Sequence, residues 1–257
     1  MSGAGGAAYE EWVAQHDMLS ATDCDAIRRH IAVLGQLPLI SLVLPLAAPT
    51  RIDAALVAVR GQLYPGWELI VAAAPAAQHP ARAALLAAAR EARVRLLPCR
   101  AAHPTALANL ALDAAQGGFV GFLAPGDLLD ARALYEMAVA SNAEPRLDLI
   151  FSDEDAIDAA GHRSAPRFKP GWDPERALAT DPVGALALFR RALVAELGGL
   201  RTEAAPAERH DLALRVAARV TSDRIGHIPA VLCHRAASAG ADPVSAASVR
   251  AHLAARG

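Results

Sequence analysis

The chain has 257 residues, of which 54% are hydrophobic and 4% aromatic, and its formal net charge is -2. This length is sufficient to bury a sizeable core in one large α/β domain or, as the alternative, in two small ones. No block of like charge occurs along the sequence, which argues against nucleic acid or an anionic membrane as a partner.

Three widely spaced cysteines without a CxxC pair are typical of reduced thiols in a cytoplasmic protein, rather than of disulfides or a zinc site. The N-terminal stretch lacks the basic and apolar regions of a signal peptide. The longest apolar runs contain proline and are shorter than the ~20 residues of a membrane helix. We therefore predict a cytoplasmic protein without a membrane span.

The first predicted element is a helix over residues 20–35, with Ser20 or Thr22 as its N-cap. Apolar runs then recur at intervals of roughly 25 to 29 residues, and the segments between them repeat apolar residues in helical steps. Continuous apolar strands that alternate with helices predict an α/β fold, with a mixed, mainly parallel sheet and helices on both faces. The predicted strands are 39–46, 67–74, 93–98, 119–123 and 147–152.

The pattern changes after residue 152. A polar, proline-rich segment at 164–175 precedes a strand at 184–189, and helices near 190–197 and 208–219 lead to an apolar run at 227–234. The tail from residue 240 has a weakly helical pattern typical of a mobile end. Since neither a linker nor a repeat occurs, we predict one domain over 1–257, with an N-terminal helical extension at 1–36 and a tail at 240–257.

Several stretches, in this order along the chain, carry a family resemblance. They are "YEEWVAQHD", "PLISLVLP", "QLYPGWELIV", "ANLALDAAQGGFVGFL", "LIFSDEDAIDAAGHRSAPRFKPGWDPE", "FRRALVAELGGLR" and "RIGHIPAVLCHR". The chain resembles glycosyltransferase family 2 with the GT-A fold, of the kind found in bacterial surface-polysaccharide assembly. The similarity extends from residue 9 to residue 240, and the fifth stretch is its longest and most specific part.

The resemblance implies a Rossmann-like mixed sheet and a nucleotide-sugar donor. It also implies a divalent cation, Mn²⁺ or Mg²⁺, at a DxD motif, and sugar transfer to a glycan acceptor with inversion at the anomeric carbon. Such a cation offsets the charge of the departing diphosphate, and a carboxylate takes the proton of the acceptor hydroxyl.

The donor-binding loops depart from the family pattern. Ala47 and Ala48 stand where the first strand is usually followed by Tyr-Asn, and residues 72–75 read Ala-Ala-Ala-Pro in place of paired aspartates. A methyl group accepts no hydrogen bond from a base or a ribose. Asn109 is kept where the family carries asparagine, and the resemblance assigns it to substrate binding.

The segment "FLAPGDLLD" matches the DxD motif, but its three aspartate positions hold Ala124, Gly126 and Asp127. Asp127 is a candidate metal ligand, although one carboxylate with waters and a diphosphate would hold a hard cation weakly. The alternative, which we favour, is that Asp127 follows a Pro-Gly turn and caps a helix that begins at Leu128.

The position of the usual catalytic aspartate holds Arg209, which stays protonated and accepts no proton. Glu208 and Asp211 are the remaining candidates for a catalytic carboxylate, and Glu208 could act only if the start of the helix shifted. The alternative, again favoured, is that both are ordinary acids in the first turn of a helix.

His234 stands where the family often has a histidine that joins the metal, but a lone histidine after a strand is more often structural. The candidate substrate-binding group comprises three adjacent acids, a lysine and a tryptophan. The acids could equally organise a solvated loop, and the tryptophan could anchor its loop instead of stacking on a sugar. The five residues are Asp153, Glu154, Asp155, Lys169 and Trp172.

Two functional hypotheses follow, and we favour the first. Small residues replace pocket positions at three separate loops while the core pattern is intact, so the chain is predicted to be a glycosyltransferase-like domain with impaired catalysis. It would bind a glycan, or a partner glycosyltransferase, and need no cofactor. The alternative is an active transferase that takes a nucleotide-sugar donor and a glycan acceptor at an unusual or metal-independent site. A weaker third hypothesis is a decayed gene product, and alanine-rich composition could explain individual replacements.

Overall fold

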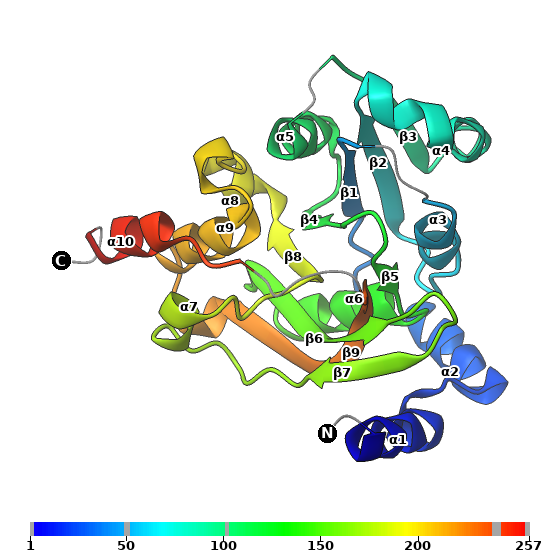
Figure 1. The fold of residues 1–257 in the computed structure, drawn as a ribbon. Helices are drawn as coiled ribbons and strands as arrows, with labels where there is room; N and C mark the ends of the chain where they lie inside the picture. The colour runs from blue at the N-terminus through cyan, green and yellow to red at the C-terminus, as the bar shows by residue number, and fades with distance from the viewer. Residues whose placement is uncertain (1–2, 49–51, 101–102, 238–242, 255–257) are drawn as a thin grey trace.

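The computed structural model describes residues 3–48, 52–100, 103–237 and 243–254 (Figure 1). The helices are α1 (Gly3–Trp12), α2 (Ala21–Ile31), α3 (Asp53–Arg60), α4 (Pro75–Ala88), α5 (Pro104–Ala114), α6 (Ala133–Ala143), α7 (Arg176–Ala179), α8 (Arg191–Glu196), α9 (Glu208–Ala217) and α10 (Ala246–Ala254). The strands are β1 (Ile40–Leu46), β2 (Trp67–Ala73), β3 (Val94–Pro98), β4 (Phe119–Phe122), β5 (Leu128–Leu129), β6 (Leu149–Ile157), β7 (Arg163–Arg167), β8 (Ala187–Arg190) and β9 (Ile225–Ala236). A π-helical turn, Val13–Asp17, follows α1, and short 3₁₀ turns occupy Thr202–Ala204 and Ser222–Arg224.

Within the described residues, nine strands form one sheet in the order β3-β2-β1-β4-β8-β6-β9-β5, and β7 pairs with β6. The strands β3, β2, β1 and β4 run parallel to one another, as do β6 and β9. β8 is antiparallel to both of its neighbours and joins the two halves. The mixed α/β sheet predicted from the spacing of apolar runs is therefore confirmed.

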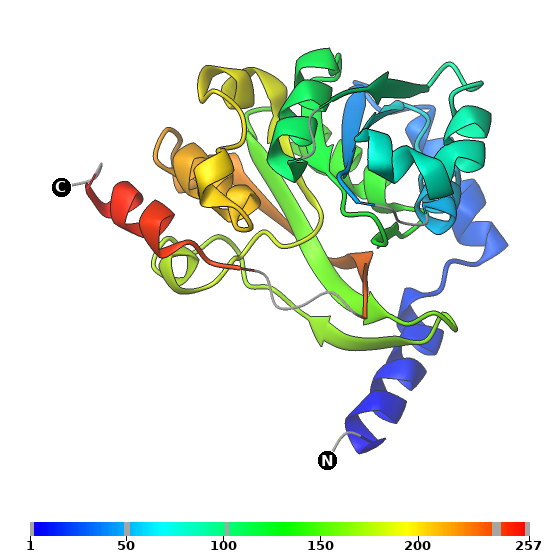
Figure 2. The same ribbon diagram turned by 45° about the horizontal axis from the view of Figure 1, so that its top comes forward.

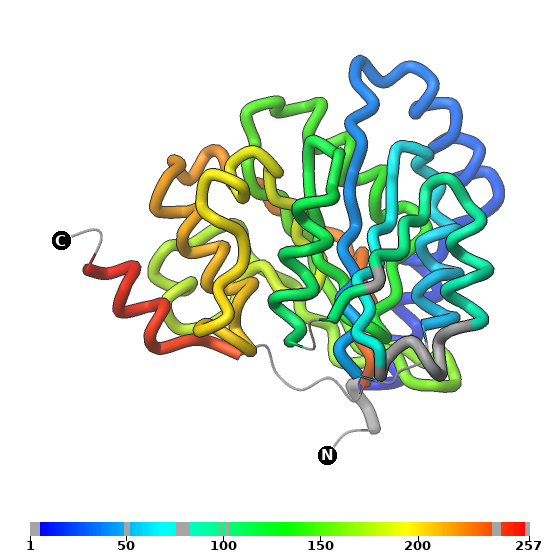
Figure 3. Tube along the Cα trace, turned by 90° about the horizontal axis from the view of Figure 1, so that it is seen from above, coloured from blue at the N-terminus to red at the C-terminus, as the bar shows by residue number. Residues whose placement is uncertain are grey.

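Helices flank this sheet because its strands are apolar along their length. Every residue of β2 is buried, and β1 is buried except for the half-exposed Pro45. α5 packs against β1 and β2, and α6 packs against β6 and β9. Seen from above, α5, α8 and α9 lie along one side of the sheet and α2 along the other (Figure 3).

The N-terminal helical extension contains a capped helix and packs against the sheet through α1. The side chain of Ser20 accepts a hydrogen bond from the backbone of Asp23, and the Asp23 carboxylate accepts one from the backbone of Ser20. This capping box confirms Ser20, rather than Thr22, as the N-cap of α2. α1 packs against β7 at the far edge of the molecule (Figure 2).

The predicted tail contains a packed helix. α10 lies against α9, and Ser248 and His252 of α10 are buried. Residues 238–242 and 255–257, which belong to the predicted tail region and its approach, lie outside the described part of the chain. None of the described helices combines the length and the apolar character that a bilayer crossing requires.

Two local predictions are wrong. Leu128 and Leu129 form strand β5, which pairs with Cys233 and His234 of β9, and the next helix begins only at Ala133. Asp127 therefore caps no helix. The three acids Asp153, Glu154 and Asp155 lie inside β6 and are buried, rather than in a solvated loop after it.

Candidate functional site

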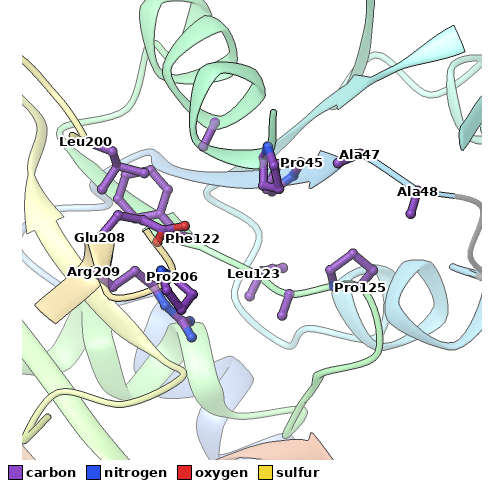
Figure 4. A pocket seen from close by; sticks show the side chains of 13 residues that line it. Pro45, Ala47, Ala48, Phe122, Leu123, Pro125, Leu200, Pro206, Glu208 and Arg209 are labelled. Atoms are coloured by element: carbon purple, nitrogen blue, oxygen red, sulfur yellow. The ribbon is translucent and has the colours of Figure 1, made fainter. Parts of the chain in front are cut away.

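A cavity of about 480 Å³ opens where the carboxyl ends of β1 and β4 meet the start of α9 (Figure 4). This is the edge of the sheet at which ligands of α/β proteins usually bind. Its walls come from four separate parts of the chain. They are Pro45, Ala47 and Ala48 at the end of β1, Pro104 and Ala108 of α5, Phe122 to Pro125 at the end of β4, and Leu200, Pro206, Glu208 and Arg209 before and at the start of α9.

Most of this lining is apolar. Glu208 and Arg209 carry the only charged side chains among the described residues that line the cavity, and alanine, proline, leucine and phenylalanine supply the rest. The alanines at the end of β2 contribute no polar wall either, because Ala73 is fully buried, Ala74 is 1% exposed and neither lines the cavity. The cavity therefore offers little to the base, the ribose or the phosphates of a nucleotide.

Glu208 is the first residue of α9, and it points into the cavity together with Arg209 (Figure 4). Its Oε2 atom is buried, and no described group donates a hydrogen bond to it. Arg209 donates from one guanidinium nitrogen to the carbonyl oxygen of Ala185 over 3.1 Å. From the sequence, Glu208 was expected to reach the site only if the start of the helix shifted, whereas α9 begins at Glu208 and already directs its side chain into the cavity.

Asp211 lies one turn along α9 and away from this cavity. Its carboxylate is buried, accepts a hydrogen bond of 2.7 Å from Nε of Arg215 and lies 3.9 Å from Arg201. Arg215 also donates to the carbonyl oxygens of Leu197 and Gly199. Asp211 thus lies in the first turn of α9, as the favoured alternative predicted, and its buried ion pairs, which that alternative did not include, connect the helix to the preceding loop.

Asp127 follows a tight turn, in which its N–H donates to the carbonyl oxygen of Ala124 over 3.1 Å. Gly126 occupies this turn with φ of +144°, a conformation that L side chains rarely adopt. The Asp127 side chain is buried, and burial raises the pKa of its carboxyl above the ordinary value, although Arg209, Arg235 and the backbone of Ala236 oppose that shift. Because burial disfavours the charged form of this carboxyl, Asp127 is less suited than an exposed carboxylate to hold a hard cation.

Replacement of Asp127 by asparagine is expected to leave the protein at least as stable near neutral pH. In the folded state Asp127 holds its proton to higher pH than an unfolded aspartate, whose pKa is about 3.9. The free energy of unfolding of the wild type therefore falls as the pH rises from the unfolded pKa through the higher folded pKa. The asparagine variant has no such titration and does not lose this stability. Denaturant unfolding of both proteins across pH measures the difference, and a variant markedly less stable than the wild type at pH 7 would contradict this role.

His234 of β9 is committed to a buried ion-pair network. Its Nδ1 lies 2.7 Å from Oδ1 of Asp155, whose Oδ2 accepts hydrogen bonds from the Tyr9 hydroxyl at 2.8 Å and from Nε of Arg163 at 2.6 Å. Arg163 in turn donates to Asp17, at the end of the π-helical turn. This network fastens the N-terminal extension to β6 and β9.

The other predicted substrate-binding acids are also satisfied internally. Oδ1 of Asp153 lies 2.8 Å from both the backbone N–H of Lys169 and Nε2 of His227. Glu154 accepts hydrogen bonds from Lys169 at 2.9 Å, from Arg167 at 2.6 Å and from the backbone of Ala185 at 2.7 Å. Asp153, Glu154 and Lys169 are all buried, so these contacts hold the sheet and the segment after β7 together.

Lys169 uses its three ammonium protons inside the protein. They go to the carboxylate of Glu154 and to the carbonyl oxygens of Ser152 and Val183, at 2.9, 2.6 and 3.0 Å. Gly184 makes this approach feasible, because an added Cβ would collide with the carboxylate of Glu154 and the ammonium group of Lys169. Trp172, the other candidate from the same segment, is half-buried and packs against the core.

Asn109 joins α5 to the loop before α9. Its Nδ2 donates to the carbonyl oxygen of Leu200 at 2.8 Å, and its Oδ1 accepts the N–H of the same residue at 2.9 Å. Because Leu200 lines the cavity, Asn109 shapes one wall of it from behind. Its role in substrate binding remains a prediction.

The donor atoms of this region do not fit a divalent cation. Within the described residues, no three histidine, cysteine, aspartate or glutamate side chains converge as a metal site would require. Asp127 is buried near two arginines, and His234 is paired with Asp155. Ca²⁺, Mg²⁺ and Mn²⁺ prefer several oxygen ligands, and this chain presents no such set at the DxD position.

Several cavity residues were not predicted from the sequence. Leu200 and Pro206 come from the irregular segment before α9, and Phe122 was counted only as a core residue of its strand. No sequence periodicity marks such positions. The strand order, with β1 beside β4, is what brings them to the same place.

Solved structures with a similar fold are glycosyltransferases. The structure of S. aureus TarS 1-349 in complex with UDP-GlcNAc matches 79% of this chain and 60% of its own, with a TM-score of 0.62 and 18% identity. The mannosyltransferase PcManGT from Pyrobaculum calidifontis, in complex with GDP-Man and Mn²⁺, matches 83% of this chain and 68% of its own, with a TM-score of 0.55 and 18% identity.

The chain has the GT-A fold of glycosyltransferases. The fold that the sequence resemblance implied is thereby confirmed. At this level of identity, the solved structures establish the architecture of the GT-A domain and leave its ligands open.

Curated relatives cover nearly the whole GT-A domain. The O-antigen biosynthesis protein RfbC of Myxococcus xanthus is 41% identical over 264 residues, and the uncharacterised protein y4gI of Sinorhizobium fredii is 34% identical over 263. No protein-family model matches the chain. The alignments span 97% and 98% of this chain but only 20% and 28% of the relatives, so the domain corresponds to a fraction of each. The resemblance to glycosyltransferases of surface-polysaccharide assembly is confirmed.

Proposed function

We propose that this GT-A domain serves the assembly of a bacterial surface polysaccharide by binding a glycan or a partner glycosyltransferase, and that its metal-dependent donor site is lost. Homology to a protein named for O-antigen biosynthesis supports the setting. The main support for loss of the donor site is the almost entirely apolar lining of the cavity at the ends of β1 and β4.

The electrostatics of the cavity support the same conclusion. A nucleoside diphosphate brings negative charge, which a bound cation normally offsets. Here Ala124 stands at the first carboxylate position, Asp127 is buried beside arginines, and Glu208 adds a carboxylate to the cavity. Arg209 is the single cation lining this cavity among the described residues, so the site offers a diphosphate little net attraction.

Calorimetric titration with UDP-, GDP- and dTDP-sugars, each with and without Mn²⁺, tests this proposal. We expect dissociation constants weaker than about 1 mM in every case, because the lost hydrogen bonds and ion contacts normally supply the affinity. A complex tighter than this that requires Mn²⁺ would overturn the proposal. The matched control is Ala124→Asp with Arg209→Asp, which restores two acids at the positions where the family carries them.

A metal-independent transferase is the second candidate, and one observation favours it. Glu208 and Arg209 both point into the cavity, where an arginine can pair with a phosphate and an unpartnered carboxylate can accept the proton of an acceptor hydroxyl. In that reaction the deprotonated hydroxyl oxygen forms the new bond at the anomeric carbon, and the nucleoside diphosphate leaves. Tight binding without Mn²⁺ that Arg209→Gln abolishes, with turnover that Glu208→Gln abolishes, would establish this candidate in place of the first.

A further inference from the structure

A second hollow, of about 420 Å³, is lined by the end of β7, the loop that follows it, and residues at the start of α7 and just after it. Its volume falls within the usual range for small-ligand sites. It shares no lining residue with the cavity at the ends of β1 and β4. Its lining comprises Arg167, Phe168, Lys169, Arg176, Thr180 and Asp181, together with three prolines.

Phe168 is an exposed aromatic residue held in a fixed position. It lines the hollow and is 59% exposed, yet its ring meets the edge of Trp12 at a centroid distance of 5.6 Å. Trp12 stacks on Tyr9 at 5.7 Å, and the Tyr9 hydroxyl donates to the buried Asp155 at 2.8 Å. A chain of contacts therefore connects this ring to Asp155 of β6, while part of the ring stays accessible to a ligand.

The charge at the rim of the hollow is positive. Arg176 is exposed, and its guanidinium forms no ion pair or hydrogen bond with any described residue. Arg167 is bound to Glu154 and to the carbonyl oxygen of Asp181, and its side chain is 40% exposed. The carboxylate of Asp181 points inward, where it accepts hydrogen bonds from the backbones of Val183 and Gly184.

We propose that this hollow binds an acidic saccharide, with the face of a pyranose ring on Phe168 and its carboxylate on Arg176. The C–H groups on one face of a pyranose suit the π surface of an aromatic ring. Guanidinium groups bind carboxylates through paired hydrogen bonds. This assignment rests on the proposed glycan-binding function. It places glycan binding away from the donor cavity, on the segment that also contains the predicted substrate-binding residues Lys169 and Trp172.

The test uses two tetrasaccharides of equal length. One alternates glucuronic acid with N-acetylglucosamine, and the other contains N-acetylglucosamine alone. Calorimetry on the whole chain is expected to detect the acidic tetrasaccharide at millimolar affinity or tighter, with weaker binding of the neutral one. Phe168→Ala should weaken the acidic complex by about fivefold, in line with one lost stacking contact. Arg176→Gln should weaken it by about tenfold, in line with one lost charged hydrogen-bond pair.

Two variants elsewhere on the surface serve as controls, and both are expected to bind as the wild type does. Arg90→Gln removes an exposed arginine, and Val57→Ala truncates a side chain that is 65% exposed on α3. The melting temperature of each variant checks that it is folded. Arg176→Gln leaves the contact between Phe168 and Trp12 intact, so it remains informative if Phe168→Ala disturbs that segment.

Four outcomes would overturn the inference. They are no binding of the acidic tetrasaccharide, equal binding of both tetrasaccharides, affinity unchanged in Phe168→Ala and Arg176→Gln, and full competition by inorganic phosphate, which would indicate an anion site without saccharide recognition. Each leaves the titration of nucleotide sugars unaffected, so failure of this inference is distinguishable from failure of the proposed loss of the donor site.

Discussion

Replacement of Glu154 by leucine is expected to lower the free energy of unfolding by about 3–5 kcal/mol, the cost of breaking a buried ion pair by removing one partner. The glutamate side chain is 1% exposed and is shared by the ammonium group of Lys169 and the guanidinium group of Arg167. Its loss leaves Lys169 buried with carbonyl oxygens as its remaining acceptors. Denaturant unfolding at pH 7 measures the effect.

The matched variant for this test is Lys169→Met. It should be less destabilising than Glu154→Leu, because Glu154 keeps Arg167 and the backbone N–H of Ala185 as partners. The double variant should lose less unfolding free energy than the two single variants lose in sum, because it leaves neither the buried ammonium group nor the carboxylate without its partner. A Glu154→Leu protein within about 1 kcal/mol of the wild type would show that these residues are not structural.

The second large effect is expected for Asp155→Asn. This carboxylate receives hydrogen bonds from His234, Arg163 and Tyr9, and hydrogen bonds to charged groups contribute about 1.5–3 kcal/mol each at most. Because they share one site and the amide retains some of them, we expect a total loss of about 3 kcal/mol. The N-terminal extension should separate from the sheet first, which limited proteolysis detects.

The pH dependence of the same variant provides an independent check. Burial opposes ionisation of Asp155, but the hydrogen bonds from His234, Arg163 and Tyr9 outweigh it and hold the pKa of this carboxyl below its ordinary value. Its stabilisation is therefore complete above the unfolded pKa of about 3.9 and is lost as the pH falls through the lower folded value. The difference in the free energy of unfolding between wild type and variant should therefore disappear in that acidic range. Asp25→Asn, which alters an exposed ion pair with Arg28, should show no comparable gap.

The sheet was predictable because its strands are long enough to carry a pattern. Runs such as residues 39–46 and 67–74 are apolar throughout, and the helices between them repeat at helical spacing. β5 was missed because two residues, Leu128 and Leu129, carry no period, and their strand character comes from pairing with β9. Taken alone, Pro-Gly-Asp followed by two leucines predicts a turn and a helix. Pairing with the distant strand β9 makes these leucines a strand instead.

The acidic cluster was misplaced for a related reason. Three consecutive acids are unfavourable in a buried strand unless cations are supplied from elsewhere. Here the partners of Asp155 include Tyr9, which is 146 residues away, and His234, which is 79 residues away. Because no local pattern reveals contacts at such separation, the sequence left a solvated loop and a substrate-binding cluster as equal alternatives.

The candidate site was predictable in position and less so in content. The ends of the first and fourth predicted strands do meet, and Ala47, Ala48, Ala124, Glu208 and Arg209 line one cavity there. Asp127 and His234, which the family resemblance placed at the metal, do not line it. The direction of individual side chains was not available from the sequence. Glu208 enters the cavity while Asp211, three residues later, is turned towards Arg215.

Electron paramagnetic resonance of Mn²⁺ tests the loss of the metal-dependent donor site most directly. The signal of free Mn²⁺ is recorded with UDP alone and with UDP plus the protein. The expected result is that the protein removes no signal beyond that removed by UDP, because no described set of side chains provides the several oxygen ligands that the cation prefers. A further loss of signal that requires both the protein and UDP, and that Asp127→Asn abolishes, would contradict the account.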